Sequence, residues 1–72
     1  MMPLALLGVG ESGTITDIRG KEDVIHHLHN LGFAAGTDVE VVGNTDAGMI
    51  IAVKGSRVAL NRGMVSKITV NR

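Results

Sequence analysis

Short stretches of alternating apolar and polar residues, separated by glycines, recur along this chain. The stretch GTITDIRG is rich in β-branched residues, and DVEVVGN alternates charged and apolar positions. Near the end, VSKITV places Ser66, Ile68 and Val70 on one side of an extended segment. Alternation of this kind predicts half-buried strands, and the ten glycines supply turns between them. The pattern therefore indicates a small, mainly β domain.

The stretch GMIIAVKGSRVALNRG consists of two apolar runs around a short polar centre, which is typical of a β-hairpin. The centre of the predicted hairpin is Lys54-Gly55-Ser56-Arg57. With Gly55 at the first turn position, we predict a type II′ turn, because that turn needs positive φ there.

One segment, about residues 21–31, has a helical period instead. Val24, Leu28 and Leu31 fall at positions i, i+4 and i+7 and form a single apolar stripe. Gly32 then ends the helix, because glycine readily takes the left-handed conformation that follows a last helical turn. We expect the next residue, Phe33, to pack back on Leu28.

Size and composition predict one domain spanning residues 1–72. A chain of 72 residues is near the lower limit for folding without staples, and 44% hydrophobic residues suffice for a core. The absence of cysteine excludes disulfides and thiolate zinc sites and suits a reducing, cytoplasmic setting. The apolar opening MMPLALLGVG is too short to cross a bilayer, so we expect a first strand or a segment docked on the core.

Charge is balanced over the whole chain but not along it. Residues 1–46 carry two bases against seven acids, a net charge of −5, whereas residues 47–72 carry five bases and no acid, a net charge of +5. Such asymmetry has two interpretations: a basic docking face, or two halves that neutralise each other within the fold. The first interpretation makes four late bases candidates for partner binding: Lys54, Arg57, Arg62 and Lys67.

All three histidines lie on the predicted helix. With the apolar stripe turned inward, His26 and His29 lie nearly opposite it, with Glu22 one turn before His26, and His27 falls at the edge of the stripe. One carboxylate and two imidazoles on an exposed face can bind a divalent transition metal such as zinc, and can bridge two copies of the chain. The alternative is a solvated helix face that binds no metal. The chain requires no cofactor under that alternative.

The sequence gives little support for dinucleotide binding, catalysis or nucleic-acid binding. GVGESG matches the glycine pattern of dinucleotide sites, but those sites need a helix after the glycines, and here the strand-like TITDI follows. Ser12, Ser56 and Ser66 have no base at motif spacing, so we expect no enzyme. Nucleic-acid binding is also not expected, because stacking aromatic residues are absent and the net charge is zero.

The order of these segments resembles the ferrous iron transport protein A (FeoA) family. The resemblance runs from about Leu4 to Val70 and depends on an ordered set of short patterns rather than on one motif. The patterns are a turn and strand from Gly10 to Ile15, a helix closing in Leu31, Gly32, Phe33 and Gly36, a distal hairpin with Val53, Gly55, Ala59 and Leu60, and the final Ile68 and Val70.

The resemblance implies an SH3-like β-barrel of about five strands with one inserted helix. It also implies a small cytoplasmic accessory protein, recruited to the inner face of the membrane by docking on FeoB, the ferrous iron transporter that carries a GTP-hydrolysing domain. Two alternatives stay open: a metal-binding carrier or sensor that uses the Glu22, His26 and His29 cluster, and a regulatory domain that acts with a metal-dependent repressor.

Overall fold

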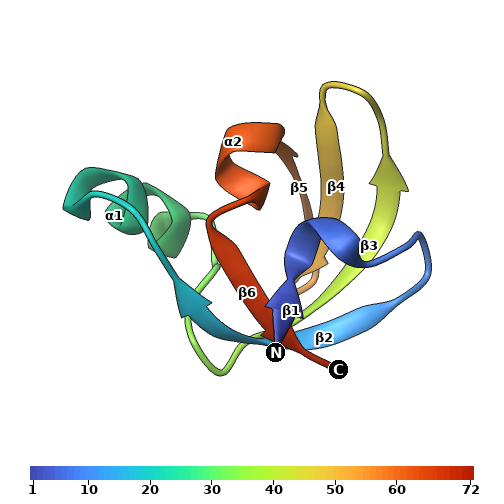
Figure 1. The fold of residues 1–72 in the computed structure, drawn as a ribbon, viewed down its shortest axis with the longest axis horizontal. Helices are drawn as coiled ribbons and strands as arrows, with labels where there is room; N and C mark the ends of the chain where they lie inside the picture. Colours follow the sequence, from blue (N-terminus) through green and yellow to red (C-terminus); the bar gives the residue numbers. More distant parts are fainter.

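One antiparallel sheet of six strands organises the chain. The computed structural model describes residues 1–72, and its strands follow the order β1-β6-β2-β3-β4-β5 (Figure 1). A 3₁₀ turn, η1 (Leu4–Leu6), and two helices, α1 (Glu22–Asn30) and α2 (Arg62–Val65), join or flank the strands. The strands are β1 (Met2–Pro3), β2 (Ser12–Ile18), β3 (Asp38–Asn44), β4 (Gly48–Val53), β5 (Ser56–Asn61) and β6 (Ile68–Asn71).

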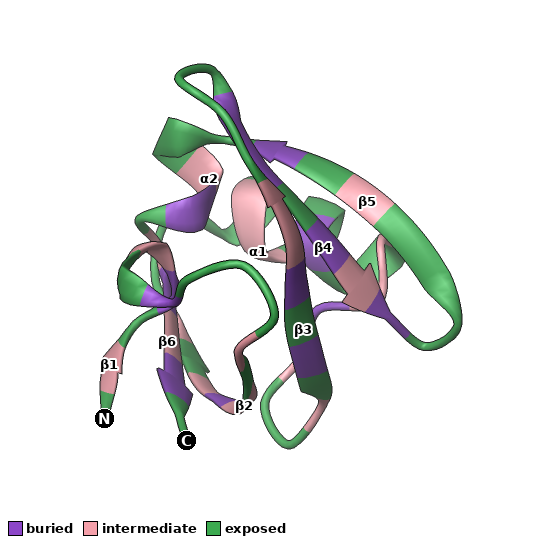
Figure 2. Cartoon of the chain, turned by 90° about the vertical axis from the view of Figure 1, so that its right-hand side faces the viewer, coloured by how far each residue is buried: buried purple, intermediate pink, exposed green.

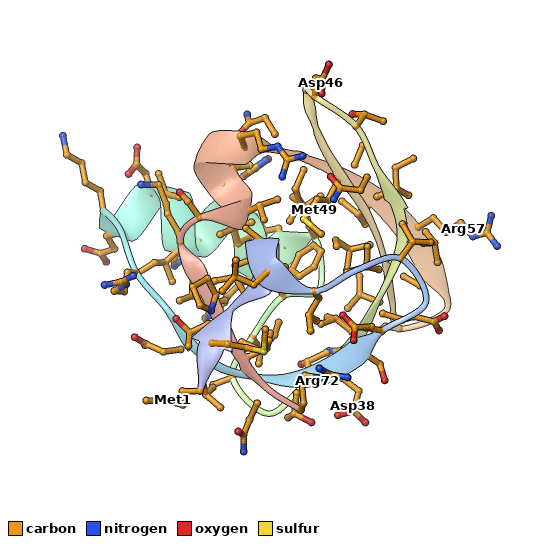
Figure 3. The ribbon with its side chains drawn as sticks, turned by 45° about the vertical axis from the view of Figure 1, so that its right-hand side comes forward. Met1, Asp38, Asp46, Met49, Arg57 and Arg72 are labelled. Carbon is orange, nitrogen blue, oxygen red and sulfur yellow. The ribbon has the colours of Figure 1, made fainter.

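The sheet curls around a single apolar core. Met49 is one of the buried core residues and lies inside the molecule in Figure 3. Residues along β3 and β4 alternate between the core and the surface, as the sequence pattern predicts (Figure 2). The core has no buried polar or charged side chain. It consists of fourteen buried residues: Leu4, Leu7, Ile15, Leu28, Phe33, Val39, Val41, Met49, Ile51, Val53, Leu60, Val65, Ile68 and Val70.

Helix α1 ends as the sequence predicts. Gly32 has a φ of 103°. The Phe33 amide donates to the Leu28 carbonyl over 2.9 Å, and the Gly32 amide donates to the His29 carbonyl over 2.9 Å. These two bonds form a Schellman motif, which brings Phe33 against the last turns. Phe33 and Leu28 are both fully buried, so the only aromatic side chain anchors the helix to the core.

The β4–β5 hairpin is present, but its turn is not the predicted one. Val53 pairs with Ser56, so the loop consists of Lys54 and Gly55 alone. Their φ angles are 48° and 77°. Positive φ at both central positions defines a type I′ turn, so the type II′ prediction is wrong. The turn lies one residue earlier than predicted because Lys54, although not a glycine, adopts the left-handed conformation.

The sheet does not close into a barrel, and it has more strands than the five expected. Strand β5 pairs only with β4, and β1 pairs only with β6. Between these outer strands lie η1 and α2, which contact each other at the end of the core. Helix α2 itself was not predicted, so the expectation of a single helix is wrong. It begins at Arg62, and the preceding Asn61 is its N-cap: the Asn61 side chain accepts a hydrogen bond from the Met64 amide over 2.9 Å.

The first strand of the chain, β1, pairs with the last strand, β6. The prediction for the apolar opening is confirmed in both its forms, because β1 pairs with β6 and the following Leu4 and Leu7 are buried. The last strand begins later than predicted: Ser66 is the C-cap residue of α2, and β6 starts at Ile68. Both termini therefore lie side by side (Figures 1 and 2).

Candidate functional site

Helix α1 presents its predicted polar face to solvent. Glu22, His26 and His29 are all exposed, while Leu28 on the opposite side is buried. The helix has two acids in its first turn, where carboxylates interact favourably with the helix dipole. The structure thus places the three predicted metal ligands on one side of the helix.

A shallow, open hollow on α1 involves a slightly different set of side chains. It is lined only by polar residues, namely Glu22, Asp23, His26, His27 and Asn30. His27 is exposed and belongs to this hollow, whereas His29 does not. The sequence signal for His27 is its i, i+4 spacing from Asp23, which repeats the spacing of Glu22 and His26. No group of three or more histidine and acidic side chains in the structure can hold a metal ion.

The β4–β5 hairpin brings together two of the four candidate partner-binding bases. Lys54 lies in the turn and Arg57 near the start of β5, and both are exposed. The Arg57 side chain points away from the molecule (Figure 3). Lys54 shares a shallow hollow with Asp38 and Glu40 of β3. Arg57 of β5 does not line this hollow and forms no ion pair.

The other two candidate bases lie elsewhere. Arg62 follows β5 at the end remote from the turn and donates to the Asn44 side chain and the Thr45 carbonyl, both over 2.6 Å. It thereby fixes the β3–β4 turn. Lys67 precedes β6, and its stem lies over Gly20. The four bases thus do not form one compact patch.

Only one ion pair links the two oppositely charged halves of the chain. Arg72 meets Glu11 at 2.8 Å, and no other salt bridge is present. Of the five late bases, only Arg72 is therefore neutralised by a direct ion pair. Arg57 in particular forms no ion pair within the chain.

The glycine pattern GVGESG forms a turn. The Glu11 amide donates to the Gly8 carbonyl over 3.0 Å, and the Gly10 amide donates to the Val41 carbonyl over 2.8 Å. Strand β2 follows at Ser12, so no helix is available to bind a phosphate. The prediction of a turn is confirmed.

Exposed apolar side chains are a feature that sequence reasoning missed. Leu6 is 67% exposed and Val9 62% exposed, both in the opening run, where the pattern gives no sign of which residues face water. Ile50 is 38% exposed on β4, opposite the small Ala59 of β5. No helix in the structure has both the length and the apolar character needed to cross a bilayer.

Comparison with known proteins now identifies the family. The model of the FeoA domain matches residues 2–72. A protein of Methanocaldococcus jannaschii that bears the name Fe(2+) transport protein A is 33% identical over 70 residues, which cover 97% of this chain and 85% of that protein.

Two solved structures extend the comparison to the fold. The crystal structure of an iron uptake regulatory protein (FeoA) has a TM-score of 0.89 at 27% identity, covering 97% of this chain and 93% of the other. A manganese-dependent transcriptional repressor has a TM-score of 0.87 at 20% identity, but this chain covers only 39% of it, and the likeness concerns the fold alone. The resemblance inferred from the sequence is confirmed: this chain belongs to the FeoA family and has its SH3-like fold.

Proposed function

We propose that this chain is a cytoplasmic accessory protein of a ferrous iron transport system. It docks on the cytoplasmic part of the membrane transporter FeoB, which recruits it to the inner face of the membrane, and adjusts the assembly or GTP turnover of that transporter. Membership of the FeoA family and the name of the M. jannaschii relative support a role in ferrous iron transport. The chain itself carries out no reaction under this proposal.

The observation that carries the docking proposal is the unpaired basic charge of the β4–β5 hairpin. Residues 47–72 contain five bases and no acid, and of these only Arg72 forms an ion pair. Arg57 extends from a regular strand, which holds its position while leaving the charge in solvent (Figure 3). A fixed surface of one sign steers association with a partner of opposite sign and makes the association rate depend on salt.

Binding to the soluble GTPase domain and to the full membrane transporter, measured at low and high salt, tests the proposal. We expect Arg57→Glu to weaken binding about tenfold at low salt and less at high salt. Arg19→Glu is a matched control, because Arg19 is exposed but lies on the loop between β2 and α1. Absence of binding by the unaltered chain to either form of the transporter at every salt concentration would rule out docking.

A metal-binding carrier or sensor is the second candidate, and the hollow on α1 favours it. Two carboxylate–imidazole pairs, Glu22 with His26 and Asp23 with His27, line this hollow, one helical turn apart within each pair. Because no group of three such side chains within one chain can hold a metal ion, a second copy of the chain would have to supply further ligands. Titration with zinc, followed by histidine chemical shifts, distinguishes this candidate: no specific shift of His26 or His29 at one equivalent of metal would eliminate it.

The third candidate, a regulatory domain acting with a metal-dependent repressor, depends on fold alone. The repressor comparison shows the same fold within a longer chain. Co-purification of this chain with a DNA-bound protein would favour that role over docking on a transporter, and the absence of any such partner would remove it.

A further inference from the structure

Strand β5 is an open edge of the sheet. It lies at one end of the strand order and pairs only with β4, over six consecutive residue pairs without a bulge. Figure 2 shows no strand beyond it on its outer side. An edge strand of this kind leaves every second backbone amide and carbonyl without a partner in the sheet.

The register identifies which groups are free. In a two-residue turn the carbonyl of Val53 and the amide of Ser56 bond each other, so these two residues form a hydrogen-bonded pair. Hydrogen-bonded and non-bonded pairs then alternate along an antiparallel ladder. The pairs Ala52–Arg57 and Ile50–Ala59 are consequently non-bonded. The backbone groups of Arg57 and Ala59 therefore point away from β4, towards the open edge.

No other part of the chain satisfies these groups. None of the seventeen backbone hydrogen bonds outside helices and strands involves Arg57 or Ala59, and no side chain bonds their backbone. Both residues are exposed. Three devices that block an edge, a proline, a bulge and a very short strand, are absent from β5.

Side chains beside the free groups indicate what the edge can bind. Arg57 and Ala59 lie on the same face, two residues apart. Arg57 has no acidic partner within the chain. Ala59 is small and leaves its cross-strand neighbour Ile50 38% exposed. An added strand can therefore place an acidic side chain opposite Arg57 and an apolar side chain over Ala59, in contact with Ile50.

We propose that β5 binds an extended segment of a partner protein as a seventh strand, with an acidic and an apolar residue two positions apart facing Arg57 and Ala59. Backbone hydrogen bonds supply affinity in this mode, and alternate side chains supply selectivity. The inference deepens the proposed function, on which it rests for the identity of the partner, by naming the surface and the kind of segment that docks there.

Charge argues against a second copy of the chain as the occupant. In an antiparallel pairing of two β5 strands centred on Ala59, Arg57 of one copy faces Asn61 of the other. Strand β5 contains no acid, so a second copy offers Arg57 no opposite charge. An acidic segment of a different protein supplies that charge.

A synthetic peptide tests the edge independently of the transporter. The probe is the capped peptide Thr-Ile-Thr-Glu-Thr, and its control has lysine in place of glutamate. Chemical shifts and hydrogen exchange of all amides in the ¹⁵N-labelled chain report where the peptide binds. We expect the Arg57 and Ala59 amides to exchange rapidly in the free chain and at least about tenfold more slowly with saturating peptide. The lysine peptide is expected to bind about tenfold more weakly.

Two variants at one position separate backbone pairing from side-chain contact. Ala59→Pro removes the free amide without removing a bond to β4, and should weaken peptide binding about tenfold. Ala59→Val adds a comparable side chain but keeps the amide, and should retain the slowed exchange at Arg57. If Ala59→Pro does not fold, the exchange rates of the unaltered chain still decide the matter.

Three results would overturn the inference: no slowing at Arg57 and Ala59 with the peptide, shifts centred on another element, or equal binding by Ala59→Pro and Ala59→Val. Slow exchange of both amides in the free chain that increases with protein concentration would also overturn it, because it would show a second copy on the edge. Failure of the chain to bind the transporter, with normal peptide binding, would instead reject the proposed function and leave the edge site intact.

Discussion

The two outermost strands of the sheet are protected to very different degrees. Strand β1 has two residues, one of them Pro3, and the chain turns directly into η1, which contacts α2. Strand β5 has six residues, regular pairing and two exposed residues whose backbone groups face outward. A proline and a short length make an edge unsuitable for further pairing. The fold thus covers one edge with its own chain and leaves the other available to a partner.

The covered edge should depend on its buried anchor. Leu4 is fully buried in η1, whereas Leu6, two residues later, is 67% exposed. We expect Leu4→Ala to lower the free energy of unfolding by about 2–5 kcal/mol, because it leaves a cavity in the core. Chemical denaturation followed by circular dichroism measures this loss. Leu6→Ala is the matched control and should change stability by less than about 0.5 kcal/mol; equal losses for the two variants would show that η1 is not an anchor.

The open edge should tolerate proline only at alternate positions. Val58 forms a hydrogen-bonded pair with Ile51, so Val58→Pro removes a bond of the ladder, leaves the buried Ile51 carbonyl without its partner and should cost about 2–3 kcal/mol. Ala59→Pro removes an outward amide and should cost only about 1 kcal/mol. Thermal or chemical unfolding of both variants gives the comparison. If Ala59→Pro were the more damaging of the two, the assignment of outward groups on β5 would be incorrect.

The turn that leads into the open edge carries backbone strain. Lys54 has a φ of 48°, a conformation that asparagine adopts more readily than lysine. Lys54→Asn should therefore raise the free energy of unfolding by about 0.5–1 kcal/mol. Lys54→Gln removes the same charge without relieving the strain, so it should leave stability nearly unchanged. An identical effect of the two substitutions on stability would contradict this explanation.

The ion pair at the end of β6 should contribute least. Glu11 meets Arg72 at 2.8 Å and accepts a hydrogen bond from the Gly8 amide over 2.6 Å, both near the surface. Glu11→Gln keeps an acceptor for the amide but loses the charge, and should cost at most about 1 kcal/mol. The cost should fall as salt is added, which unfolding at two ionic strengths would show. A larger, salt-independent cost would mean that the pair has a structural role beyond its charge.

Local patterns in the sequence were enough to predict most of the elements. The limits of β3 follow from its alternation, and the end of α1 follows from Gly32 and Phe33, because these signals lie within a few neighbouring residues. The type of the hairpin turn was missed because Lys54 adopts a conformation that its side chain does not favour. Helix α2 was missed because it has four residues, and its main signal is a single capping residue, Asn61.

Features that depend on distant parts of the chain were not predictable in the same way. Closure of the sheet depends on whether β5 meets β1, and no local pattern contains that information. Where each late base lies in the fold was not predictable from local sequence either. Their shared charge suggested one surface, but Arg62 binds the β3–β4 turn and Lys67 lies over Gly20, which leaves Arg57 as the free charge on the open edge.

The most direct test of the central claim is to map the contact surface on this chain when it binds its proposed partner. Amide chemical shifts of the ¹⁵N-labelled chain would be followed during titration with the cytoplasmic GTPase domain of the ferrous iron transporter. The account predicts that the largest changes lie along Lys54 to Asn61, at the open edge of the sheet. Binding with the largest changes on α1, Glu22 to Asn30, and none on β5 would contradict it.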